Sequence, residues 1–314
     1  MKFTTQTMQD IIYILTNKLK DEESVTFSTL NPDISNEYAG TKIIINNITY
    51  LYHGFKAWVN LAELLKCKIL MPKELEYPLV EITFKKLSSS SSFHLNSSVK
   101  KDEKYGVDSN FFNINKMEEP SFIYYYKQAL ENVKLHARKT ILNLGVNRGD
   151  EFEVIKFMLD DSSYEKSKLV GVDHSQSAIA YAKTIFKEDN VKLYAEDINN
   201  LKNLTLGRFD LLISIGTLQS PSINFKPFFM SLVQDYLNKD SAIILGFPNS
   251  RWIDGEMIYG AKAPNYAMSE MSLLFTDVIF CKKYLQQKKY RVTITGKDYI
   301  FLTATKIGCT IPSL

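Results

Sequence analysis

The second half of the chain alternates between strand-like and helix-like segments, and this alternation limits the possible folds more than any other feature. Short runs of branched and aromatic residues predict five strands, at 140–144, 168–172, 191–194, 209–215 and 241–247. Segments with apolar residues at helical spacing lie between or after them, at 151–159, 177–186, 227–237 and 268–287. This order is typical of a parallel sheet with helices on both faces.

The alternation ends in a different way at the carboxyl end of this region. Two more strand-like segments, 290–295 and 299–305, are joined only by Gly296, Lys297 and Asp298, which leaves no room for a helix. We therefore predict a hairpin, and with it one antiparallel strand at the end of the sheet. Rossmann sheets that bind NAD are normally all parallel, so this ending favours a different family of α/β proteins.

The first part of the chain has a mixed α+β pattern and ends in a polar stretch. Helical stripes and strand-like runs are predicted at 7–19, 41–52, 55–65 and 79–84, with a turn at Asn46-Asn47 and with His53 and Trp58 as packing residues. Five serines begin at Ser88, and charged residues follow them. We expect a small N-terminal α+β domain (1–87), a linker (88–110) and a second domain (111–314).

Composition excludes several classes of protein. The chain has 314 residues, 45% hydrophobic and 23% charged, and no apolar run reaches the length of a membrane helix, so no membrane partner is expected. Three isolated cysteines, Cys67, Cys281 and Cys309, indicate neither a disulfide scaffold nor a metal site, and they favour the cytoplasm. A net charge of +3 with only five arginines does not indicate a nucleic-acid partner, although it leaves one possible.

The segment Ile-Leu-Asn-Leu-Gly-Val-Asn-Arg-Gly-Asp-Glu at 141–151 joins the first predicted strand to its helix. Ligands of open α/β sheets bind at such strand ends, and glycine lets the backbone approach them. A dinucleotide fingerprint has a third glycine where Asn147 stands between Gly145 and Gly149. The missing glycine makes this a poor NAD-binding motif, although Asn adopts left-handed backbone more readily than most residues.

Acidic residues follow the next two strands. The second strand ends Leu-Val-Gly-Val-Asp-His-Ser, and its Asp173 can accept hydrogen bonds from both hydroxyls of a ribose. After the third strand, Asp197 in Ala-Glu-Asp-Ile can accept from an adenine amino group, with Ile198 against the ring. The fourth strand and its turn read Phe-Asp-Leu-Leu-Ile-Ser-Ile-Gly-Thr-Leu-Gln, at 209–219.

These four segments, in this order and with the terminal hairpin, resemble class I S-adenosylmethionine-dependent methyltransferases over residues 140–306. The resemblance implies an α/β fold, with a Rossmann-like seven-stranded sheet whose last strand is antiparallel, and S-adenosylmethionine as the cofactor. It places the methionine moiety over Gly145, Asn147 and Gly149. It also implies ribose contacts at Asp173 and His174, adenine contacts at Asp197 and Ile198, and a border of the sulfonium at Ser214, Ile215 and Gly216.

One departure from the family concerns charge. The family usually has Asp or Glu at the position of Asn143, where a carboxylate helps to orient the ammonium end of the cofactor. Asn143 keeps the ability to form hydrogen bonds but has no charge. A non-catalytic protein that binds the cofactor is therefore an alternative to an enzyme.

The acceptor of the methyl group is not encoded in a catalytic triad, because the family has none that is universal. The loops after the fourth and fifth strands should form the acceptor site, with Gln219 and Asn249 as catalytic candidates and Arg251, Trp252 and Tyr266 as substrate-binding candidates. We favour a small polar metabolite as the acceptor, with the N-terminal domain shaping its site. An RNA or protein methyltransferase with an N-terminal docking domain is the alternative.

Overall fold

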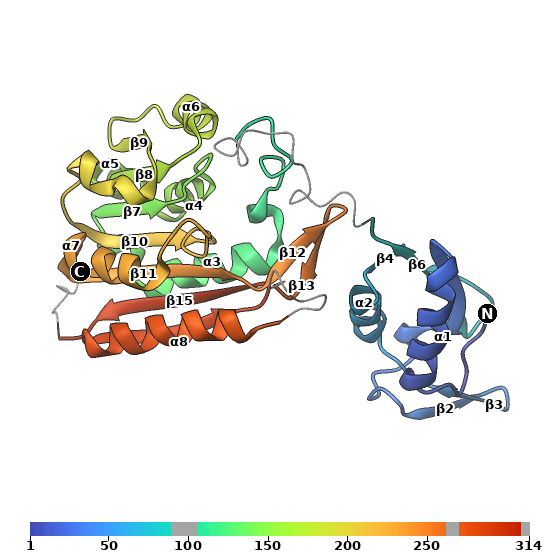
Figure 1. The fold of residues 1–314 in the computed structure, drawn as a ribbon. Coiled ribbons are helices and arrows are strands. Elements are labelled where there is room, and N and C mark those ends of the chain that lie inside the picture. The colour runs from blue at the N-terminus through green and yellow to red at the C-terminus, as the bar shows by residue number, and fades with distance from the viewer. Residues whose placement is uncertain (89–105, 262–269, 309–314) are drawn as a thin grey trace. The chain divides into compact units, whose positions relative to one another are not determined.

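The computed structural model describes residues 1–88, 106–261 and 270–308 of the 314-residue chain. The chain divides into two compact units (Figure 1), and each has hydrophobic clusters of its own. The first unit contains Met1–Ser92 together with Trp252–Ile258, and the second contains Phe93–Arg251 together with Tyr259–Leu314. In the described residues, no helix is long and apolar enough to cross a membrane.

The first unit packs two helices, α1 (Met8–Asp21) and α2 (Phe55–Leu64), with an antiparallel sheet. The strands of the sheet are β1 (Ser24–Leu30), β6 (Leu79–Lys86), β4 (Cys67–Ile69) and β5 (Lys73–Glu74). A separate hairpin of β2 (Lys42–Ile45) and β3 (Ile48–Leu51) turns at Asn46-Asn47, as predicted. Trp58 is fully buried and its ring lies 5.3 Å from that of His53, so both are packing residues as expected.

The second unit is built on a seven-stranded sheet in the order β14-β15-β11-β10-β7-β8-β9 (Figure 1). Its strands are β7 (Thr140–Leu144), β8 (Lys168–Asp173), β9 (Val191–Ala195), β10 (Phe209–Ile215), β11 (Leu237–Pro248), β14 (Tyr290–Gly296) and β15 (Tyr299–Lys306). Strands β7 to β11 pair in parallel, whereas β15 is antiparallel to both β11 and β14. The predicted α/β sheet and its terminal hairpin are thus confirmed.

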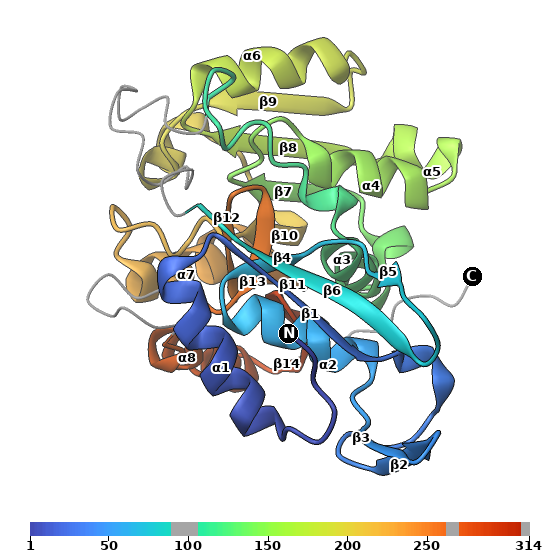
Figure 2. The same cartoon turned by 90° about the vertical axis from the view of Figure 1, so that its right-hand side faces the viewer.

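Helices cover both faces of this sheet. One face packs against α3 (Pro120–Asn132), α4 (Asp150–Met158), α5 (Asp161–Lys166) and α6 (Gln176–Ile185). The other face packs against α7 (Phe225–Asp235) and α8 (Ser272–Gln287). Figure 2 shows α6 beside β9 at one edge of the sheet. The central strands β7, β8, β10 and β11 are therefore buried on both faces for most of their length, which explains their nearly continuous apolar sequences.

Two segments beside the sheet have starts or turns set by single residues. Helix α3 begins only at Pro120, because proline has no N–H and a fixed φ that suit the first helical position. The segment after β11 forms a hairpin of β12 (Ser250–Ile253) and β13 (Glu256–Tyr259) where we expected a loop. Its turn is Asp254-Gly255, with φ values of 50° and 80° that suit a tight hairpin turn.

Candidate functional site

The turn between β7 and α4 forms a shallow backbone cradle at the carboxyl edge of the sheet. Gly145, Asn147 and Gly149 have φ values of 78°, 45° and 97°, so all three occupy left-handed backbone. A Cβ on Gly145 would lie 1.8 Å from Oγ1 of Thr217, and one on Gly149 would lie 2.4 Å from the ring of Phe186. Glycine is therefore required at both positions, because the backbone of the turn packs closely against the side chains of Thr217 and Phe186.

Asp173 ends β8 beside this turn and is only 6% exposed. Its Oδ2 accepts a hydrogen bond from the Asn147 N–H (2.9 Å), and its Oδ1 accepts one from the Ser175 N–H (3.0 Å). Nδ1 of the half-exposed His174 lies 3.5 Å from the same Oδ1. The carboxylate thus fixes the turn and still has lone pairs that can accept from a ligand hydroxyl.

Asp197 and Ile198, which follow β9, have different surroundings. Asp197 is exposed, and its Oδ1 accepts from the Asn199 N–H (2.8 Å) at the start of a 3-10 segment, Ile198–Leu204. Ile198 is 6% exposed and packs in the hydrophobic core with Leu201. The Asp197 carboxylate therefore faces solvent at the strand end, whereas Ile198 lies mainly in the core.

The end of β10 lies next to the glycine turn. Ser214 is buried, and its Oγ donates to the backbone oxygen of Leu144 (3.2 Å). Ile215 packs in the core, and Gly216 turns the chain away with a φ of 73°. Because β10 pairs in parallel with β7, these residues and Gly145 share one edge of the sheet.

Two amide side chains at the same edge have buried oxygens without a hydrogen-bond partner in the structure. They are Oε1 of Gln219, after β10, and Oδ1 of Asn249, after β11. Asn249 is 3% exposed, and its Nδ2 donates to the backbone oxygen of Lys297 (3.0 Å), which fixes the amide. Buried acceptors of this kind normally have partners, so each oxygen can take a donor from a bound molecule.

Of the three remaining acceptor candidates, Arg251 and Trp252 lie in β12. Arg251 donates through Nη1 to the backbone oxygen of Gly260 (2.8 Å), an interaction inside the hairpin segment. Trp252 is half-buried in β12 and groups with the first unit. Tyr266 lies outside the described residues, as does Cys309.

A buried polar cluster that sequence reasoning missed lies beside Asn143. The Asn143 side chain is buried, and its Nδ2 makes a weak hydrogen bond to Oε2 of Glu151 (3.5 Å). The other carboxylate oxygen of Glu151 is 3.3 Å from Nζ of Lys116. Tyr126 is the only fully buried member of the Tyr124-Tyr125-Tyr126 run, and its hydroxyl donates to the backbone oxygen of Glu151 (3.3 Å). The signal in the sequence that could have indicated this cluster was an acidic residue, Glu151, two positions after Gly149.

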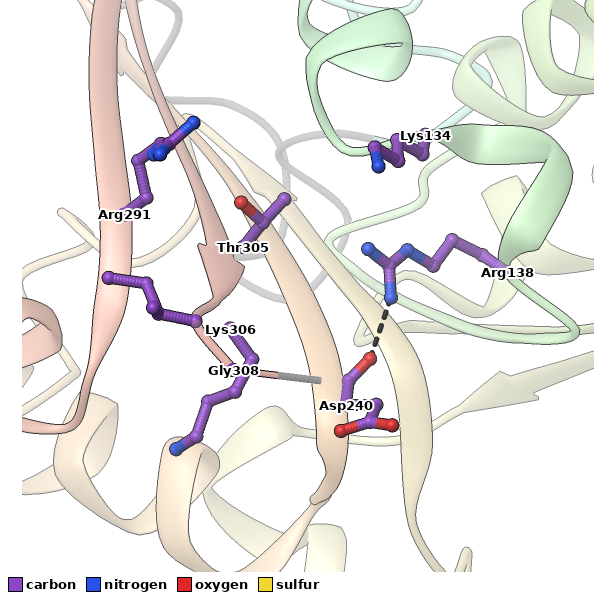
Figure 3. A pocket seen from close by; sticks show the side chains of 8 residues that line it. Lys134, Arg138, Asp240, Arg291, Thr305, Lys306 and Gly308 are labelled. Atoms are coloured by element: carbon purple, nitrogen blue, oxygen red, sulfur yellow. Dashed lines mark hydrogen bonds between the residues drawn. The ribbon is translucent and has the colours of Figure 1, made fainter. Parts of the chain in front are cut away.

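The opposite edge of the sheet carries a basic cavity of about 250 Å³, shown in Figure 3. Lys134, Arg138, Arg291 and Lys306 line it together with Asp240. Arg138 donates to the backbone oxygens of Val133 (2.8 Å) and Asp240 (2.6 Å), and Lys306 donates to a backbone oxygen as well. Two of the four cations therefore hold the protein backbone, and we do not place the acceptor here. Within the described ranges, no group of three or more metal-ligating side chains was found.

Comparison with known proteins identifies the family to which residues 135–294 are similar. The model of a family described as "Methyltransferase domain" matches residues 135–294, about half of the chain. No curated protein matches the chain.

Solved structures give only low similarity. An S-adenosylmethionine-dependent methyltransferase from Aquifex aeolicus is 13% identical, with 61% of this chain and 96% of that chain covered and a TM-score of 0.42. Magnesium protoporphyrin IX methyltransferase from Synechocystis PCC 6803 is 14% identical, with 62% of this chain and 85% of that chain covered and a TM-score of 0.39. A putative rRNA methylase from Clostridium thermocellum is 16% identical, with 59% of this chain and 96% of that chain covered and a TM-score of 0.40. At these values the substrates of those proteins say nothing about this one.

The family match covers the sheet from β7 to most of β14, including the glycine turn, Asp173 and the end of β10. The sheet also has the antiparallel last strand that the sequence motifs implied. The chain therefore belongs to the methyltransferase domain family, as a class I enzyme that uses S-adenosylmethionine.

Proposed function

We propose that this enzyme transfers the methyl group of S-adenosylmethionine to a small polar acceptor bound at the carboxyl edge of the sheet. The observation that carries the acceptor class is the pair of buried, unpartnered amide oxygens on Gln219 and Asn249. Gln219 follows β10, which ends beside the glycine turn, and Asn249 follows β11, the next strand of the sheet. An acceptor with N–H or O–H donors would supply the missing partners.

The residues of the turn and of β8 fit the proposed cofactor. The cradle of Gly145, Asn147 and Gly149 would lie under the methionine moiety, and Asp173 can accept from the ribose hydroxyls. His174 lies next to the ribose position, and Asp197 is free of the core to meet the adenine amino group. The sulfonium supplies an activated methyl group, so the protein needs mainly to align the acceptor in line and to exclude water.

Gln219 and Asn249 would position the acceptor atom. An amide oxygen cannot act as a strong base, but it can orient an N–H or O–H group and leave a lone pair of the acceptor directed at the methyl group. Asn249 suits this task because its hydrogen bond to Lys297 fixes the side chain. This arrangement favours an acceptor whose nucleophilic atom carries a hydrogen. On transfer the sulfonium would become the neutral thioether of S-adenosylhomocysteine, and the proton of the acceptor would pass to water.

The cofactor part of the proposal is tested through Asp173. Asp173→Asn keeps the shape but replaces one acceptor oxygen by a donor, so the affinity for S-adenosylhomocysteine should fall about 10- to 100-fold. Isothermal titration calorimetry measures this, with Asp161→Asn on the exposed start of α5 as the matched control. Unchanged affinity in Asp173→Asn would place the ribose elsewhere.

The acceptor class is tested by labelling. The enzyme and methyl-tritiated S-adenosylmethionine are incubated with separate small-molecule, RNA and protein fractions of a cell extract, and we expect label only in the small-molecule fraction. Label in RNA or protein would favour the alternative acceptors, and no label in any fraction would favour a non-catalytic protein.

Gln219→Ala and Asn249→Ala should lower the labelling rate without changing the affinity for S-adenosylhomocysteine. Gln128→Ala on α3 removes another buried, unpartnered amide oxygen and serves as the control.

The cysteines support a reducing compartment, and we extend the proposal to the cytoplasm. Cys67 and Cys281 are buried free thiols. Burial raises the pKa of Cys67 to about 11, and it raises the pKa of Cys281 even further above its ordinary value. Both thiols therefore stay protonated and unreactive near neutral pH.

A further inference from the structure

The second unit contains a buried ion pair beside the glycine turn. Nζ of Lys116 is 3.3 Å from Oε1 of Glu151, and the two side chains are 16% and 4% exposed. Lys116 lies in a 3-10 turn just before α3, whereas Glu151 lies in the first turn of α4. Two segments that are 35 positions apart in the sequence thus bring opposite charges to one place.

The surroundings of this pair keep Lys116 charged. Burial alone would lower the pKa of Lys116, but the nearby acidic groups, Glu151 foremost, together outweigh burial, and the resulting pKa is raised. Lys116 also lies over the ring of Phe122, with Nζ 5.4 Å from the centroid. Burial raises the pKa of the Tyr126 and Tyr299 hydroxyls, so both stay neutral neighbours.

A buried ion pair is a poor device for stability. Taking two charges out of water costs several kcal/mol per ion, and apolar residues of similar size often serve as well or better. The aromatic side chains around Lys116 and Glu151 would allow such a replacement. The pair therefore suits a second task, in which its charges meet charges of a bound molecule.

The position of the pair indicates what that molecule carries. The carboxylate of Glu151 reaches Asn143 at the end of β7, where the sequence lacks an acidic side chain. It thus supplies negative charge directly beside the cradle of 145–149, and Lys116 adds a positive charge next to it. A zwitterion can bind to both side chains. Glu151 then pairs with the positive group of the ligand and Lys116 with its negative group, so no buried charge is left unpaired.

We propose that Glu151 and Lys116 recognise the amino-acid end of S-adenosylmethionine, with Glu151 receiving its ammonium group and Lys116 its carboxylate. This inference rests on the proposed cofactor site. Glu151 thereby supplies the negative charge that Asn143 lacks, and the hydrogen bond from Asn143 holds the Glu151 carboxylate in place. The pair is then a binding element for the cofactor as well as a link between the start of α3 and the start of α4.

Two ligands that differ only at this end test the proposal. S-adenosylhomocysteine carries the amino-acid end, whereas 5′-methylthioadenosine has the same nucleoside and sulfur without it. In calorimetry on the full chain, Glu151→Gln and Lys116→Met should each weaken S-adenosylhomocysteine binding about 10- to 100-fold. Binding of 5′-methylthioadenosine should change less than about twofold, because none of its groups meets the pair.

Controls separate recognition from structure. Lys156→Met removes a more exposed ion pair, with Glu188, on the same helix α4, and it should change neither affinity. The double variant Glu151→Gln/Lys116→Met leaves no unpaired buried charge, so it should remain folded where a single variant fails. In that variant the loss must again be confined to S-adenosylhomocysteine.

The outcomes are distinct. An equal loss for both ligands in the double variant, or no loss for S-adenosylhomocysteine, would overturn the proposal and leave the pair a structural link. Failure of the wild-type chain to bind either ligand would instead overturn the proposed cofactor site itself.

Discussion

Gly145 shows how a single residue sets the shape of the cofactor turn. Its φ of 78° and the Thr217 side chain leave no space for a Cβ. Asp173 acts from the other side, because it accepts the N–H of Asn147 and so fixes the middle of the same turn. The shape of the turn therefore depends on Gly145, which has no side chain, and on the carboxylate of Asp173.

Gly145→Ala should destabilise the protein more than Gly207→Ala does. Both glycines have a similar positive φ (78° and 82°), so the backbone strain is shared, but a Cβ on Gly207 would meet nothing within 4 Å. The overlap with Thr217 should add about 1–3 kcal/mol to the loss of unfolding free energy. Thermal denaturation measures the difference, and adding Thr217→Ala should recover part of it. Equal melting temperatures for the two variants would show that Thr217 yields without cost.

At the scale of elements, the turn of the β14–β15 hairpin connects three segments. The Ser121 hydroxyl, in the first turn of α3, donates to Oδ2 of Asp298 at 2.6 Å. Backbone oxygens of Lys297 and Asp298 accept from the side chain and the backbone N–H of Asn249, at the end of β11. The antiparallel strand thus fixes both an acceptor-site candidate and the start of the helix that follows Lys116.

Asp298→Ala should lower the free energy of unfolding by about 1–3 kcal/mol, because it leaves the Ser121 hydroxyl without its charged acceptor. Asp298→Asn keeps an acceptor oxygen and should recover at least half of that loss. Urea denaturation followed by circular dichroism gives both values. Identical losses in the two variants would mean that the charge of Asp298, and not its hydrogen bond to Ser121, stabilises this edge.

The parts of the structure that could be predicted from the sequence are those set by local patterns. Alternating periodicity predicted the strands, and the short Gly296–Asp298 connection predicted the terminal hairpin. The left-handed backbone of Asn147 followed from its residue type. The Lys116–Glu151 pair could not be predicted, because a contact across 35 residues depends on how α3 and α4 pack. For the same reason, the sequence named Gln219 and Asn249 by strand order alone, without indicating their unpartnered oxygens.

At the scale of the whole molecule, the two units have separate hydrophobic cores. The clusters around Trp58 and Tyr50 contain only residues of the first unit, and the two clusters of the large sheet contain only residues of the second. Hydrophobic burial, the main favourable term in folding, is therefore achieved within each unit.

A fragment that comprises residues 106–314 should therefore fold and bind S-adenosylhomocysteine with an affinity within about threefold of the full chain, about 0.7 kcal/mol. All of the proposed cofactor residues, Lys116 and Glu151 included, lie inside it. Calorimetry on the fragment and on the full chain checks this, and labelling with the acceptor fraction shows whether transfer also needs the first unit. An insoluble fragment, or one that does not bind the ligand, would mean that residues 1–88 complete the cofactor domain.

The return of Trp252–Ile258 to the first unit has a consequence for protein engineering. The polypeptide enters the second unit, comes back for the tip of the β12–β13 hairpin, and then leaves the first unit again. A chimera that replaces residues 1–92 alone would leave that tip among unfamiliar neighbours, so residues 252–258 should be exchanged together with them.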